Sequence, residues 1–99
     1  MTRETKAILN MLEKDELIKD DVLDRHVHRN ILDEEEFART VSDLAFVLED
    51  EVRASARHHF IESSMWAEIV MPYVIEADYT EIATLWLSKI RDRRAASNR

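Results

Sequence analysis

Residues 33–62 read DEEEFARTVSDLAFVLEDEVRASARHHFIE and carry the most regular hydrophobic pattern of the chain. Apolar positions advance in steps of three or four residues, as the buried face of an α-helix requires. From Phe37 to His59 the pattern covers 22 residues in six steps, about 3.67 residues per step. This period is close to the 3.6 of a straight helix and above the 3.5 of a coiled coil, so it predicts a long bundle helix. The expected buried positions are Phe37, Val41, Leu44, Leu48, Val52, Ala56 and His59, widened by Ala45 and Val47, with Phe46 off this face as a candidate second contact surface.

Acidic and amide side chains mark the expected helix ends. Asp33 and Asp78 are each followed three residues later by a glutamate, which is the spacing of a capping box. In that motif two side chains satisfy backbone amides at the start of a helix. Asn30 is the best available helix stop, because asparagine tolerates the left-handed conformation that glycine usually supplies.

Upstream, residues 3–29 carry a helical but less regular pattern, in which Asp15 and Glu16 interrupt the apolar face. Two interpretations are open. Either one helix runs throughout and polar residues interrupt its apolar face, or the helix breaks between residues 14 and 21. We favour one long helix. The short link at residues 30–32 would then turn it into an antiparallel hairpin with the next helix.

Downstream, no lysine or arginine occurs in residues 58–88, which hold both tryptophans and both tyrosines. Residues 64–77 are apolar on nearly every side, which is typical of a helix buried in a core or against a partner. Pro72 lacks an amide donor and is expected to kink or restart this helix near Val70. A last helix is expected over residues 79–95, so the two shorter helices together form a third arm.

The composition excludes most β architectures. The 99 residues include no glycine, no cysteine and one proline, whereas tight hairpin turns and phosphate-binding loops depend on glycine. The expected fold is all-α: a long antiparallel helical hairpin with a third, Pro-kinked arm, in a three- to four-helix bundle that forms one domain over residues 1–99. With no cysteine, no long apolar run and no hydrophobic leader, a cytoplasmic protein that does not contact a membrane is expected.

The net charge of −7 is unevenly distributed. Residues 89–99 carry +4 and residues 1–88 carry −11, so a body that repels phosphate is followed by a short basic tail. The tail could complement a helix dipole, or touch an acidic partner or nucleic acid. The acidic side chains of the 33–62 helix form either a solvated face or a surface for a basic protein. The candidate tail residues are Arg91, Arg93, Arg94 and Arg99, and the candidate acidic face is Glu34, Glu35, Asp43, Glu49 and Asp50.

Histidines and acids raise the question of a metal or catalytic site. Two pairs, Asp24–His28 and His58–Glu62, have the four-residue spacing that places ligands on one helix face. No Glu-x-x-His motif occurs, and a hairpin would hold the two pairs far apart. Ser63–Ser64 is more typical of a helix N-cap than of a nucleophile. We therefore expect no enzyme, cofactor or metal site, with a metal-binding bundle enzyme as the weakest alternative.

The expected function is a small acidic helical module for protein–protein interaction, such as an adaptor, inhibitor, assembly factor or chaperone-like protein, that also self-associates. Aromatic residues and methionine are enriched at interface cores, and the third arm is rich in them. The main alternative is a nucleic-acid-associated protein that uses the basic tail. The candidate partner-binding residues are Met65, Trp66, Ile69, Met71, Tyr73, Trp86 and Phe46.

Overall fold

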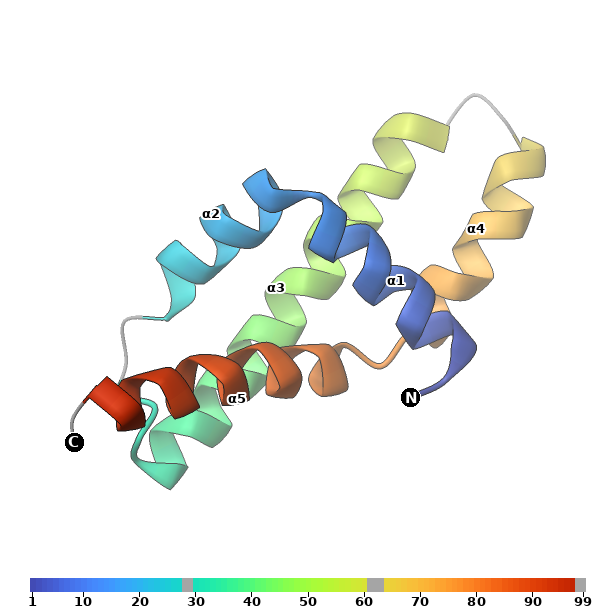
Figure 1. Ribbon diagram of the computed structural model, residues 1–99. Coiled ribbons are helices and arrows are strands. Elements are labelled where there is room, and N and C mark those ends of the chain that lie inside the picture. The colour runs from blue at the N-terminus through green and yellow to red at the C-terminus, as the bar shows by residue number, and fades with distance from the viewer. Residues whose placement is uncertain (28–29, 61–63, 98–99) are drawn as a thin grey trace.

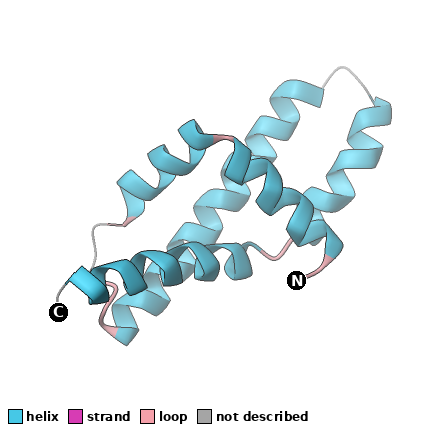
Figure 2. Ribbon diagram, in the orientation of Figure 1, coloured by secondary structure: helices cyan, strands magenta, loops and turns pink. Residues whose placement is uncertain are grey.

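The computed structural model is all-helical (Figure 1) and describes residues 1–27, 30–60 and 64–97, in which no strand occurs. Side chains are described for these residues except 16–18, 26, 57–60 and 64–67. Short loops separate α1 from α2 and α4 from α5 (Figure 2), and the molecule measures 52 × 24 × 21 Å. The all-α prediction is confirmed. The helices are α1 (Arg3–Lys14), α2 (Glu16–His26), α3 (Glu34–Phe60), α4 (Ser64–Glu76) and α5 (Tyr79–Ser97).

Helix α3 is the element on which the others assemble. The chain returns along α3 through α4 and then α5, and α5 makes the most extensive contact with it (Figure 1). Helix α2 also packs against α3, whereas α1 crosses to α4 and touches α5. The end of α5 therefore lies beside the link between α2 and α3.

The buried face of α3 follows the predicted pattern. Leu44 and Leu48 are fully buried, and Val41, Val52 and Ala56 are also core residues. A helical period places all of them on one side of α3, where α5 and α4 cover them. The other helices and their connections complete the core. They contribute Ile8, Leu12, Val22, Val27, Ile31, Val74, Ala77, Tyr79, Ile82, Ala83, Trp86 and Leu87. The predicted position at residue 59 lies outside the described side chains.

The prediction of one helix over residues 3–29 is wrong, because the helix breaks at Asp15. This residue has a non-helical backbone (φ −95°, ψ 81°), and its amide donates to the carbonyl of Leu12 at 3.2 Å. Its own carbonyl then accepts the amide of Lys19 at 3.1 Å and so starts α2. The break lets the chain turn, so that α1 packs against α4 while α2 packs against α3. The first arm of the predicted hairpin is therefore bent.

The two predicted N-caps are confirmed, but neither is a complete capping box. A carboxylate oxygen of Asp33 accepts the amide of Glu36 at 3.1 Å, and one of Asp78 accepts the amide of Glu81 at 3.0 Å. The reciprocal bonds predicted from the glutamates do not form, because the cap amides have other acceptors. The amide of Asp33, for example, donates to the carbonyl of Asn30 at 3.1 Å.

The prediction that Asn30 ends a helix in the left-handed conformation is also wrong. Helix α2 ends earlier, at His26, and no described residue has a positive φ. The side-chain oxygen of Asn30 instead accepts the amide of Leu32 at 3.3 Å, which forms a local turn just before α3.

Pro72 lies inside α4, which continues from Ser64 to Glu76, so the predicted restart near Val70 does not occur. Proline cannot donate to the carbonyl of Glu68, one turn earlier. Both residues are exposed, so water can satisfy that carbonyl. The kink itself stays a prediction.

Thr5 joins α1 to the residue before α5 and gives a test of the fold. It is fully buried, and its Oγ1 accepts the amide of Asp78 at 2.9 Å. We expect Thr5→Val to lower the free energy of unfolding by about 1–3 kcal/mol, because the substitution leaves that amide without an acceptor. Urea unfolding followed by circular dichroism measures this. Thr84→Val is the matched control: Thr84 is exposed, and its loss should change stability by less than about 0.5 kcal/mol. Equal effects of the two variants would contradict the role of Thr5.

Candidate interaction surface

Trp86 is 2% exposed and belongs to the core rather than to a surface. Its indole nitrogen donates to a carboxylate oxygen of Glu13 at 2.9 Å, and the other oxygen of that carboxylate lies 3.0 Å from the ammonium of Lys19. The ammonium also lies 5.2 Å from the centre of the Trp86 ring. The hydrogen bond from Lys19 lowers the pKa of Glu13 below its ordinary value, and the bond from Trp86 acts in the same direction. This cluster holds α1, α2 and α5 together across the break.

Helix α4 exposes an apolar face. Ile69 and Ile75 are 54% and 56% exposed, and exposed Pro72 lies between them at a spacing of three residues. Two other predicted partner-binding residues, Met71 and Tyr73, are half-buried against the core. The remaining two, at positions 65 and 66, lie outside the described side chains. Of the residues predicted on this arm, Ile69 therefore has the most exposed apolar side chain that the structure describes.

Phe46 is 73% exposed on α3. Asp43 and Asp50 lie one turn before and after it and are exposed on the same side. Glu49 is half-buried and forms an ion pair of 2.9 Å with Arg53. An isolated exposed apolar residue is ordinary, but here three carboxylates lie within about one helical turn of the aromatic residue.

A groove of about 530 Å³ opens beside Phe46, between α3 and the connection from α4 to α5. An adjoining hollow of about 210 Å³ shares Phe46 and Glu49 with it. Together they are lined by four carboxylates and one guanidinium, so their net charge is −3. The groove residues are Ala45, Phe46, Glu49, Glu76, Ala77, Asp78, Tyr79 and Thr80, and the hollow adds Asp50 and Arg53.

Tyr79 forms part of the wall of this groove and is buried. Its hydroxyl donates to the carbonyl of Val74 at 2.7 Å. Burial, followed by the nearby charge of Glu49, raises the pKa of Tyr79 to about 12. The hydroxyl therefore stays protonated and keeps the end of α4 joined to the start of α5.

The predicted acidic face divides into two groups. Asp43, Glu49 and Asp50 surround Phe46, as described above. Glu34 and Glu35 lie in the first turn of α3, where a helix dipole favours negative charge. At 1.5 Å per residue, they are about 17–18 Å from Phe46 along the helix axis. They are therefore not part of the same surface.

The predicted basic tail is the last part of α5, which continues to Ser97 rather than ending at residue 95. The guanidinium of Arg91 lies 4.1 Å from the centre of the Phe37 ring, and that of Arg94 donates to the carbonyl of Val27 at 3.0 Å. Arg93 is exposed. The prediction for residue 99 lies outside the described residues.

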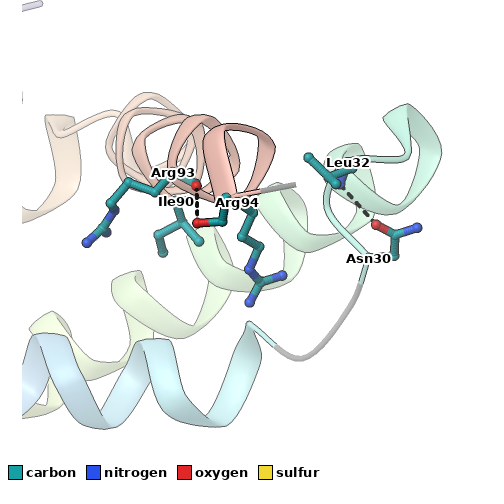
Figure 3. A pocket seen from close by; sticks show the side chains of 6 residues that line it. Asn30, Leu32, Ile90, Arg93 and Arg94 are labelled. Carbon is teal, nitrogen blue, oxygen red and sulfur yellow. Dashed lines mark hydrogen bonds between the residues drawn. The ribbon is translucent and has the colours of Figure 1, made fainter. Parts of the chain in front are cut away.

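A separate hollow of about 560 Å³, which we call the basic hollow, opens at the C-terminal end of α5 (Figure 3). Ile90 lies between the diverging side chains of Arg93 and Arg94, and Leu32 faces them from the link before α3. Asn30 and Ser97 complete the lining. Sequence patterns could not reveal this hollow, because residues 30–32 and 90–97 are brought together only by the packing of α5 on α3.

Neither predicted histidine–acid pair can be placed, because positions 28, 58 and 62 lie outside the described side chains, although Asp24 is described and exposed. In the described part of the chain, no group of three or more histidine, aspartate or glutamate side chains is arranged to hold a metal ion. No helix in that part is long and apolar enough to cross a membrane.

Comparison of the chain with protein families, with curated proteins and with solved structures finds no match.

Proposed function

We propose that this chain is a non-enzymatic protein–protein interaction module, of the adaptor, inhibitor, assembly-factor or chaperone-like kind, that acts in the cytoplasm. Its binding surface is centred on Phe46 and includes Asp43, Glu49 and Asp50. We call it the Phe46 surface. The observation that carries the proposal is the 73% exposure of Phe46 beside a groove of net charge −3.

Physical considerations favour a protein as the ligand of this surface. Aromatic side chains that enter a partner's pocket provide much of the binding energy in protein interfaces. Surrounding charges contribute selectivity and speed of association rather than affinity. The partner that fits is a cationic protein surface with an apolar pocket. The groove reaches Glu76 at the end of α4, the helix that also exposes Ile69, Pro72 and Ile75.

A nucleic-acid ligand has less support. The guanidinium of Arg91 stacks on Phe37 of the same chain. Residues 1–88, with a net charge of −11, would repel phosphate.

A photo-crosslinking amino acid tests the surface directly. We place p-benzoylphenylalanine at position 46 and, as the control, at the exposed position of Thr84 on α5. Irradiation in an extract of the source cells should give a discrete adduct from position 46, identified by mass spectrometry, and not from position 84. Adding Asp50→Lys should remove the adduct, because it reverses a charge one turn from the probe. No adduct from position 46, or the same adducts from both positions, would overturn the proposal.

A further inference from the structure

We propose that a second copy of this chain is a partner of the Phe46 surface, and that the copy binds it through the basic hollow at the end of α5. The inference rests on the proposed function, because both use Phe46. It adds the identity of the partner and a role for Arg93 and Arg94.

The basic hollow has the chemistry needed to receive an aromatic ring flanked by carboxylates. Leu32 is 41% exposed and Ile90 is half-buried, so the two provide an apolar surface inside the hollow. Two guanidiniums diverge from α5 on either side of Ile90 (Figure 3). Arg94 is anchored by its bond to the carbonyl of Val27, so its position is fixed before a ligand arrives. Guanidinium groups match carboxylates in geometry as well as in charge.

The two surfaces are complementary in both charge and polarity. The Phe46 surface has an exposed ring between Asp43 and Asp50, and the hollow has an apolar surface between two arginines. Each side therefore provides an apolar centre with charged flanks of opposite sign. Arginine stacking on aromatic rings, as Arg91 does on Phe37 in this chain, adds a further favourable contact.

One molecule cannot satisfy this pairing internally. The basic hollow lies beside Leu32, just before α3 begins at Glu34. Phe46 lies twelve residues after Glu34, which is about 18 Å along the helix axis. An arginine side chain cannot cover that distance. The contact therefore forms between copies. Because it joins two different surfaces, it is head-to-tail, and repetition gives a ring or a chain of copies.

Sedimentation velocity of the purified chain tests the inference. We expect self-association at about 50 mM salt that weakens at about 500 mM, because the contact contains exposed charges. Phe46→Ala on one side and Arg93→Glu on the other should each weaken association about tenfold or more. Lys14→Glu at the end of α1 is the matched control, because it makes the same charge reversal at an exposed residue that lines neither surface. It should associate like the unmodified chain.

Mixing the two interface variants gives the sharpest result. The Phe46→Ala copy keeps an intact hollow, and the Arg93→Glu copy keeps an intact Phe46 surface. Their mixture should form a one-to-one pair that grows no further, while each variant alone stays largely monomeric. Leu32→Ser tests the hollow a second time without changing charge, and circular dichroism checks that every variant is folded.

Two results would overturn the inference. The first is a chain that remains monomeric up to a concentration of about 1 mM. The second is self-association that neither interface variant weakens. Both leave the proposed function open to its own test. A crosslink from position 46 to a different protein, together with a monomeric purified chain, would support the proposed function and refute the second copy as partner.

Discussion

Replacing Leu48 by alanine is expected to lower the free energy of unfolding by about 2–5 kcal/mol. Leu48 is fully buried in the middle of the core face of α3, where α4 and α5 both pack. The substitution removes apolar contacts and leaves a cavity that rigid neighbouring helices can fill only in part. Domains of this size have a total stability of roughly 5–15 kcal/mol. The loss is therefore a large fraction of the whole.

The matched control lies two residues earlier on the same helix. Phe46→Ala removes a larger apolar side chain, but this side chain is 73% exposed. We expect its effect on stability to be within about 0.5 kcal/mol, as is usual for surface positions. Urea unfolding at low protein concentration, where self-association is negligible, measures both variants. A Phe46→Ala variant destabilised as much as Leu48→Ala would show that Phe46 is a structural residue, and would remove the argument for the binding surface.

The elements that could be predicted from the sequence are those set by local patterns. The core face of α3 could be predicted because a helical period places Val41, Leu44, Leu48 and Val52 on one side whatever packs against them. The caps at Asp33 and Asp78 could be predicted because a carboxylate at a helix start bonds to an amide only three residues away.

The incorrect predictions concern contacts between residues far apart in the chain. At the break at Asp15, Glu13 bonds to Trp86, 73 residues later, as well as to Lys19 on the far side of the break. The capping box at Asp78 is incomplete because Thr5, also 73 residues away, occupies its amide. Neither partner can be inferred from local spacing.

The same limit applies to the candidate surface. The composition of residues 64–88 indicates abundant apolar area, but it does not separate core from interface, and Trp86 proves to be core. Phe46 could be singled out because it lies off the helical pattern. The basic hollow could not, since its two walls meet only in the folded chain.

Trp86→Ala is expected to lower the free energy of unfolding by about 3–5 kcal/mol. It removes a large buried ring through which α5 contacts Glu13 of α1 and Lys19 of α2. Trp86→Phe separates packing from hydrogen bonding. It keeps most of the ring and removes the N–H donor to Glu13, so we expect a smaller loss of about 1–3 kcal/mol. Thermal and urea unfolding give both values. If Trp86→Phe were as stable as the unmodified chain, the bond to Glu13 would have no role in holding the bend.

The pH dependence gives an independent measure of the same cluster. Lys19, and then Trp86, lower the pKa of Glu13 below the ordinary 4.5, so the folded protein favours the ionised carboxylate. A lowered carboxyl pKa contributes stability that is present above the ordinary value and is lost as the pH falls through the folded value. Stability should therefore decrease below about pH 4.5 in part through Glu13. Because Trp86→Phe removes one of the two stabilising donors, its decrease over this range should be shallower than that of the unmodified chain. Lys19→Met, which removes the larger cause, should make the decrease shallower still. The opposite order of the two variants would show that the indole, rather than the ammonium, is the main partner of Glu13.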